Sequence, residues 1–162
     1  MIKKSIAIIL LIICSSQLVY AHSIESCFKK ASQKHDVPLH YLLAVSYTES
    51  RFKGNLSHRN KNGTHDYGLM QINSIWSNPA KKMGYNWNKI KTNSCTNIMF
   101  GSHILKLNFK RLGSWQSAIG AYNAGFSKTK KAQKRRQRYF NLVMKHRLIA
   151  KRTFKKIKHH SS

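Results

Sequence analysis

The sequence has very few acidic residues. Only four Asp and Glu stand against 30 Lys and Arg in 162 residues, so the formal net charge is +26 at pH 7. A chain this basic attracts polyanions, because their bound counterions are released when Lys and Arg neutralise them. The four carboxylates are few enough for each to be considered by itself as a candidate for chemistry, namely Glu25, Asp36, Glu49 and Asp66.

Several other motifs that carry chemistry are also missing. The chain contains no HExxH pattern, and its nine His are scattered without the spacing of metal ligands. No glycine-rich phosphate-binding loop occurs among its eight glycines. These absences argue against a zinc hydrolase and a nucleotide-dependent enzyme. We therefore expect no metal and no cofactor.

Residues 1–21 have the features of a secretory signal peptide. Lys3 and Lys4 precede an apolar run from Ile6 to Cys14, and the small residue Ala21 suits a signal peptidase. The apolar run is too short for a membrane span, and no run of about 18 apolar residues follows it. We expect cleavage after Ala21 and a periplasmic location.

Loss of this segment would remove Cys14 and leave two cysteines, Cys27 and Cys95. Because an exported chain meets an oxidising compartment, we predict one disulfide between them. The loop-entropy model gives such a bridge about 3–4 kcal/mol of stabilisation. Two buried free thiols are the alternative.

The spacing of apolar residues predicts a mostly helical single domain with a small hairpin or loop region. Ile24, Cys27, Phe28 and Ala31 form one helical stripe, and a second helix is expected over residues 38–50. Glycines close two later helical segments. We expect one folded domain over residues 22–150 and a basic tail over 151–162, with loop-like structure at 77–93.

Glu49 lies at the end of the second predicted helix, on the face that Leu42 and Val45 bury. Desolvation penalises a charged carboxylate, so the pKa of such a group should rise toward neutrality. A carboxyl with that pKa can act as a general acid at physiological pH. On the helix alone, a side chain that leaves the core for solvent explains Glu49 equally well. Glu25 fits a helix N-terminus and Asp36 a turn or cap, without any chemistry.

Three short motifs occur in order along the chain. They are "ESRF" at 49–52, "YGLMQIN" at 67–73 and "AYNAG" at 121–125. Each is weak alone, but the ordered set resembles the lytic transglycosylases of the lysozyme-like superfamily. The short length, the signal peptide and the two cysteines are similar to the small members that accompany secretion, conjugation or pilus machines.

The resemblance implies a reaction and a set of roles. The substrate would be peptidoglycan glycan strands, cleaved between N-acetylmuramic acid and N-acetylglucosamine to leave 1,6-anhydromuramyl ends. Glu49 would be the catalytic acid and base, and Tyr139 is the candidate for a further cleft tyrosine. Apolar residues such as Met70 are more often core, whereas buried amides need partners. The residues that the resemblance assigns to substrate binding are Ser50, Met70, Gln71, Asn73, Tyr122 and Asn123.

Asp66 opens a second mechanism. The stretch "NGTHDYGLMQINSIW" is also similar to the active-site hairpin of animal-type lysozymes, in which an aspartate precedes the same run. A second carboxylate facing Glu49 at about 5–5.5 Å would permit a retaining muramidase. Against it, "AYNAG" belongs to the transglycosylase pattern. A turn residue that bonds local backbone is the structural alternative for Asp66.

The C-terminal region is the most basic part of the chain, with 14 Lys or Arg and no acid from Ser127 onward. This composition is also typical of a different class of protein, a basic module that binds polyanions. The predicted signal peptide argues against nucleic acid as the partner. A solvated lysine-rich face, with weak attraction to anionic wall or lipid groups, is the simplest interpretation.

Overall fold

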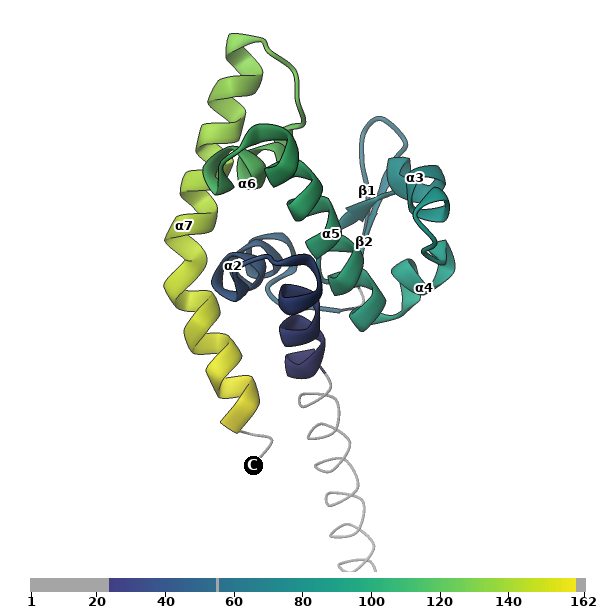
Figure 1. The fold of residues 1–162 in the computed structure, drawn as a ribbon, viewed down its shortest axis with the longest axis vertical. Helices are drawn as coiled ribbons and strands as arrows, with labels where there is room; N and C mark the ends of the chain where they lie inside the picture. The colour runs from purple at the N-terminus through teal and green to yellow at the C-terminus, as the bar shows by residue number, and fades with distance from the viewer. Residues whose placement is uncertain (1–23, 55, 160–162) are drawn as a thin grey trace, which may run out of the picture.

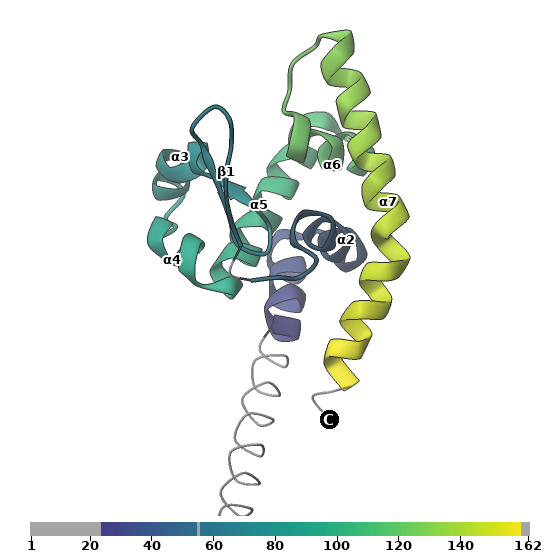
Figure 2. The same ribbon diagram turned by 180° about the vertical axis from the view of Figure 1, so that it is seen from behind.

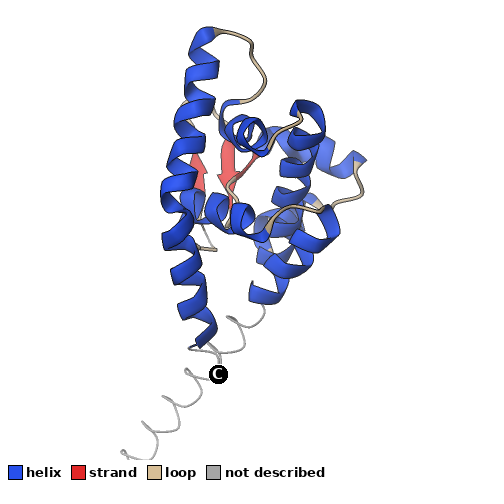
Figure 3. Cartoon of the chain, turned by 60° about the vertical axis from the view of Figure 1, so that its left-hand side comes forward, coloured by secondary structure: helices blue, strands red, loops and turns tan. Residues whose placement is uncertain are grey.

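The computed structural model describes residues 24–54 and 56–159. The predicted signal peptide, its cleavage site and the last three residues of the chain lie outside this described part. Within it, the domain is mostly helical, with a small three-stranded sheet on one side (Figures 1 and 3). This architecture agrees with the prediction of a mostly helical single domain with a small hairpin or loop region.

Helices form most of the described chain and follow the predicted apolar stripes. The first covers residues 24–35, and α2 (Leu39–Ser50) follows it after a short turn. The remaining long helices begin at polar caps or end at glycines. Asn93 caps the start of α5 and Gly113 ends it, while Ser114 caps α6. Their bounds are α5 (Ser94–Leu112), α6 (Trp115–Ala124) and α7 (Lys130–His159).

The sheet consists of three short antiparallel strands in the order β1-β2-β3. β1 (Ser57–Arg59) pairs with β2 (His65–Tyr67), and β2 pairs with β3 (Ile72–Asn73). In this register Asp66 lies opposite Asn73. The "YGLMQIN" motif thus ends one strand, makes a tight turn and forms the next.

The helices pack around α5 and α2. In Figures 1 and 2, α7 runs along one side of the domain beside α2 and α6, while the sheet lies on the other side of α5. The core between them is apolar and closely packed; its largest fully buried side chains include Phe28, Leu42, Phe100, Leu105 and Ile119. Burial of these faces supplies the main driving force that holds the helices together.

Residues 77–93 form two short helices rather than the expected loop. These are α3 (Ser77–Lys82) and α4 (Trp87–Thr92), which follow a single 3-10 turn, η1 (Ser74–Trp76). Each is anchored by one fully buried apolar side chain, Ala80 or Ile90. Six-residue helices are too short to show a full apolar period, so tertiary packing decides their structure.

The long helix α7 continues without a break across residue 150, where the sequence suggests a boundary between domain and tail. Tyr139, Val143 and Ala150 on its inner side are buried. Beyond this point Phe154 packs edge-on against Phe28, with the ring centroids 5.5 Å apart. Residues 151–156 thus contribute to the packing of the domain through Phe154. Of the helices within the described residues, none has the length and apolarity required to span a bilayer.

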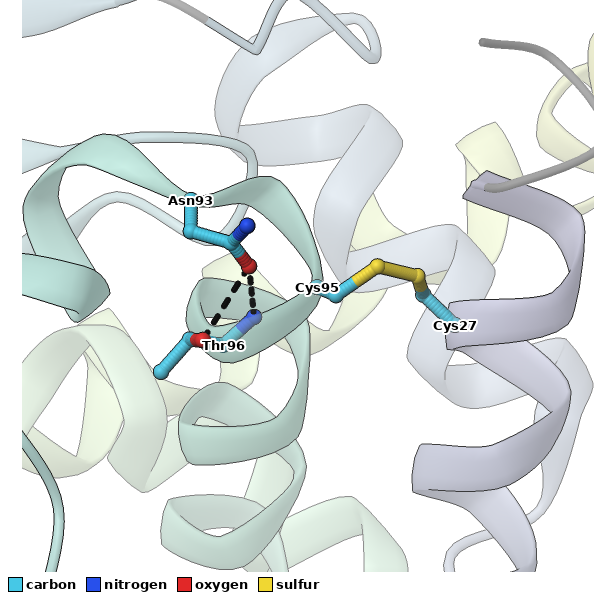
Figure 4. The surroundings of a disulfide bond; sticks show 4 residues. All are labelled: Cys27, Asn93, Cys95 and Thr96. Atoms are coloured by element: carbon cyan, nitrogen blue, oxygen red, sulfur yellow. Dashed lines mark hydrogen bonds between the residues drawn. A yellow bond between two sulfur atoms is a disulfide. The ribbon is translucent and has the colours of Figure 1, made fainter. Parts of the chain in front are cut away.

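Cys27 and Cys95 form the predicted disulfide, which joins the first helix to the first turn of α5 (Figure 4). The two Cα atoms are 5.1 Å apart, across 68 positions of sequence. The Asn93 side chain accepts hydrogen bonds from the backbone N–H and the hydroxyl of Thr96, and so fixes the same turn. The bridge therefore connects the first helix to the start of α5, which the Asn93 cap also holds.

Candidate active site

A cleft of about 960 Å³ runs between the sheet and the helices α5, α6 and α7. Its walls are mixed, with amides and hydroxyls from the hairpin and apolar side chains such as Trp76 and Ile104 from elsewhere. The sequence-predicted residues that line it are Glu49, Asp66, Gln71, Asn73, Tyr122 and Asn123. These positions span more than 70 residues of sequence, and the fold brings them together in one groove.

Glu49 lies one residue before the end of α2, where the chain turns sharply away. The next two residues after the helix, Arg51 and Phe52, have φ values of 55° and 61°. This left-handed pair ends the helix, because a right-handed helix cannot continue through residues in the left-handed conformation. Burial is the main cause that raises the pKa of Glu49 to about 7; the hydrogen bond from Tyr139 opposes this shift, and the negative charge of Asp66 adds a smaller contribution in the same direction as burial. At neutral pH the carboxyl is therefore poised between its two protonation states.

Two tyrosines lie beside Glu49, and their hydroxyls have different hydrogen-bond partners. The Tyr139 hydroxyl on α7 donates a hydrogen bond to Glu49 Oε1. The Tyr122 hydroxyl in the "AYNAG" motif donates to the backbone carbonyl of Met70, at 2.8 Å. Burial, followed by the charge of Glu49, raises the pKa of both phenols well above 10, so both are neutral donors. The tyrosine that contacts the acid is thus Tyr139, which lies outside the three motifs.

The "YGLM" turn is held by an amide from α5. Asn97 is almost fully buried. Its Oδ1 accepts a hydrogen bond from the backbone N–H of Met70 at 2.8 Å, and its Nδ2 donates one to the carbonyl of Tyr67 at 2.8 Å. Gly68 has φ +73°, and a Cβ there would lie 2.6 Å from the Asn97 amide. Glycine is therefore required at this position both by the backbone angle and by the close approach of the amide.

Ser50 and Met70 do not line the cleft, although the family motif suggested substrate contact for both. The Ser50 hydroxyl is buried and donates to the carbonyl of Leu69 at 2.8 Å, while the Met70 side chain lies in the core against Gly101. Ser50 thereby ties the end of α2 to the turn before β3. Both residues position Glu49 and its neighbours from behind, and neither side chain faces the groove.

The hairpin wall holds Asp66 in a network of amides. Asn73 Nδ2 donates to Asp66 Oδ1 at 2.7 Å, and Asn60 Nδ2 donates to Oδ2 at 2.9 Å. Thr64 accepts from the same two amides and ties them to the turn. The carboxylate is thus fixed in orientation and faces the groove that Glu49 lines. Each of its oxygens keeps free acceptor capacity toward a ligand.

Gln71 also belongs to this wall. It has a φ of 45°, and its side-chain Nε2 donates to the Gly68 carbonyl at 2.8 Å. Its left-handed conformation is stabilised by this bond and by the backbone bond to the same carbonyl. The groove thus receives a side chain whose orientation is fixed before any ligand arrives.

A smaller hollow of about 420 Å³ lies on the other side of Glu49. It shares Glu49, Asn123 and Arg135 with the main cleft, and Tyr139 forms part of its wall. Glu49 consequently lies between two depressions. A polymer bound across both would have its linkage at the carboxyl.

Sequence reasoning missed the amides that organise the site. Asn97 and Asn60 escaped notice, as did Ser46, whose buried hydroxyl donates to the Leu69 carbonyl. A signal for Asn97 does exist, because it shares the apolar stripe of α5 with Gly101 and Ile104. A buried polar side chain needs a hydrogen-bond partner. Here the partner is the backbone of the "YGLM" turn.

No group of three or more His, Cys, Asp or Glu in the described residues is arranged to hold a metal ion. The chemistry of the cleft can be described from side chains alone. It offers one acid with a pKa near 7, one fixed carboxylate and two neutral phenols. These groups suit proton transfer to and from a glycosidic linkage.

The fold and the groove define a lysozyme-like helical domain. The model of the transglycosylase SLT domain matches residues 26–141 of the chain. The chain therefore belongs to the transglycosylase SLT domain family, and it is a peptidoglycan lytic transglycosylase.

Relatives and one solved structure agree with this assignment. The chain is 34% identical to "Protein IpgF" of Shigella flexneri over 67% of its own length and 71% of that protein. It is 37% identical to the "X polypeptide" of Escherichia coli K12, over 70% and 67% of the two chains. It is 36% identical to the "Invasion protein IagB" of Salmonella typhimurium over 62% and 63%.

The fold is similar to that of the lytic transglycosylase Slt of Pseudomonas aeruginosa, solved as an inactive mutant, with a TM-score of 0.61. The sequences are 16% identical, so the likeness concerns the fold alone. It covers 81% of this chain and 24% of the longer enzyme.

Proposed function

We propose that Glu49 is the acid and base that cleaves the bond between N-acetylmuramic acid and N-acetylglucosamine, with a 1,6-anhydromuramyl end as the product. The observation that supports this most directly is a cleft carboxyl whose pKa is raised to about 7 by burial. Near that pH one group can donate a proton and then accept one. A single carboxyl is sufficient for an intramolecular reaction, which consumes no water.

The reaction has two proton transfers. Protonated Glu49 gives its proton to the glycosidic oxygen, and the bond to the muramyl anomeric carbon breaks. The Glu49 carboxylate then takes the proton of the muramyl 6-hydroxyl, whose oxygen attacks the same anomeric carbon. The glutamate ends protonated, as it began, and the atoms of the substrate are conserved.

The neighbouring groups support these steps. The Tyr139 hydrogen bond orients Glu49 and stabilises its carboxylate form between the two transfers. The fixed negative charge of Asp66 favours positive charge at the anomeric carbon as the bond breaks. Gln71, Asn73 and Asn123 offer amides to the sugar hydroxyls and acetamido groups along the groove.

A retaining muramidase is the second candidate, and the position of Asp66 favours it. Asp66 lines the same groove as Glu49. A carboxylate that attacks the anomeric carbon would form a glycosyl-enzyme, which water would then hydrolyse. The two mechanisms share the acid and differ in the group that reaches the anomeric carbon.

The site of action that we propose is the periplasm, where peptidoglycan lies. The predicted signal peptide supports this location. One relative carries the name of an invasion protein, which supports local wall opening for an envelope-spanning secretion, conjugation or pilus apparatus.

Mass spectrometry of muropeptides tests the proposal. Purified sacculi are digested with the protein, and the ends of the released fragments are identified by mass. Anhydromuramyl ends are expected. Reducing muramyl ends would assign the muramidase reaction instead, and intact sacculi at neutral pH would contradict both.

A further inference from the structure

The outer side of α7 is a basic face that the proposed reaction does not use. Lys145, Leu148, Ile149 and Arg152 are spaced i, i+3, i+4 and i+7, so they share one side of the helix. All four are exposed; Leu148 is 60% exposed and Ile149 43%. We call these four residues the outer face of α7.

The rest of α7 shows that this face is a separate surface. The buried residues Tyr139, Val143 and Ala150 lie on the opposite side, toward α2 and the core. The outer face therefore has no partner among the described residues. Along the whole helix, 13 of 30 residues are Lys or Arg and none is acidic. The ion pairs of Lys29 with Glu25 and of Lys106 with Asp36 do not involve the outer face of α7.

We propose that the outer face of α7 binds the surface of a membrane that contains anionic phospholipid. Lys145 and Arg152 would contact the phosphate groups, while Leu148 and Ile149 would enter the boundary between headgroups and acyl chains. Basic residues around exposed aliphatic ones are the features of a helix that lies in a membrane interface. Long Lys and Arg side chains can reach the headgroups while their stems cover apolar surface.

The two aliphatic residues decide the class of partner. A soluble polyanion such as nucleic acid is attracted by charge alone, and this attraction does not involve Leu148 and Ile149. Single exposed apolar residues are common on proteins, but here two neighbours lie between two basic residues on one face. Anionic bilayers supply both kinds of contact, with roughly fivefold tighter binding for each Lys or Arg near the surface.

Vesicle sedimentation tests this proposal. The protein, recovered from an exporting host, is sedimented with vesicles of phosphatidylcholine alone and of phosphatidylcholine mixed with phosphatidylglycerol. Tighter binding to the mixed vesicles is expected. The pair Lys145→Gln with Arg152→Gln should weaken that binding roughly tenfold or more. The pair Leu148→Ser with Ile149→Ser should weaken it roughly fivefold.

The matched control is Lys81→Gln with Lys82→Gln on α3, two exposed residues whose loss changes the net charge equally. It should leave vesicle binding unchanged. All variants should digest soluble glycan strands and unfold on heating as the parent does, because none of these residues lines the cleft.

Three results would overturn the proposal. Equal weakening by the control pair would mean attraction by net charge alone. Equal binding to vesicles of pure phosphatidylcholine would mean that anionic lipid is not required. Heparin binding as tight as vesicle binding, together with no effect of Leu148→Ser and Ile149→Ser on vesicles, would make the face a polyanion surface.

Discussion

Each wall of the cleft carries one carboxyl group, and the two groups have different surroundings. On the helical wall, Glu49 sits at the end of a buried helix with one phenol as its partner, and its pKa rises to about 7. On the hairpin wall, Asp66 is held by amides on both oxygens. Desolvation prepares the first carboxyl for proton transfer, whereas amide donors fix the second in orientation. The difference indicates that the helices supply the acid and the sheet supplies a fixed charge.

Glu49→Gln tests the helical wall most directly and should have the largest effect. Glutamine keeps the size of the side chain but can neither give nor take the proton, so cleavage of sacculi should fall by about 10³-fold or more. Release of muropeptides measured over time gives the rate. An active Glu49→Gln variant with a native thermal transition would refute the role of Glu49.

The same substitution should change how stability depends on pH. The folded carboxyl has a pKa of about 7 and the unfolded one 4.5. Between these values the unfolded chain releases a proton that the folded chain keeps, so this group makes stability fall as pH rises. The total loss is on the order of 3 kcal/mol and is complete above about pH 7.

Urea unfolding of both proteins from pH 4 to 8 measures this difference. Glutamine does not titrate, so the Glu49→Gln variant should lack this decline and exceed the parent in stability at pH 8. The two proteins should be similar at pH 4. Parallel curves across the whole range would mean that burial does not perturb Glu49.

Asp66→Asn tests the hairpin wall. In the transglycosylase reaction it removes the negative charge and one of the two hydrogen bonds that Asp66 accepts from Asn60 and Asn73. Cleavage should therefore fall by roughly 10–100-fold, with anhydromuramyl ends retained. Because the charge of Asp66 raises the pKa of Glu49, the pH profile should also move toward acid. A loss as large as that of Glu49→Gln would instead assign Asp66 as a nucleophile. Asn60→Ala, which removes one amide donor, should have a smaller effect.

Sequence alone predicted the helical frame because helices have local signals, and it predicted the disulfide because only two cysteines remain after the expected signal peptide. The stripe of Ile24, Cys27, Phe28 and Ala31 and the cap at Ser114 each depend on residues a few positions apart. The short helices at 77–92 lack such a signal, and packing of Ala80 and Ile90 decides them. Local periodicity therefore predicts long elements better than short ones.

The site was predictable in its members but not in their contacts. The motifs brought Glu49 and the hairpin amides to attention, yet they assigned Ser50 and Met70 to the groove. Whether a polar residue at a helix end faces inward depends on the packing of the next segment, which no local pattern contains. The same reason explains why none of the three motifs includes Tyr139, which lies 90 residues from Glu49 in sequence.

The last comparison is between the two tyrosines of the helical wall. The Tyr139 hydrogen bond lowers the pKa of Glu49, so Tyr139→Phe should raise that pKa and shift the pH profile of cleavage toward alkaline values. The rate at the optimum should fall about tenfold, as expected for loss of one hydrogen bond to a charged group. Tyr122→Phe is the matched control, because its hydroxyl donates to the Met70 carbonyl. It should lower stability by about 1–2 kcal/mol and leave the pH profile in place. Equal shifts for both variants would show that the cleft responds to its overall polarity rather than to the one bond between Tyr139 and Glu49.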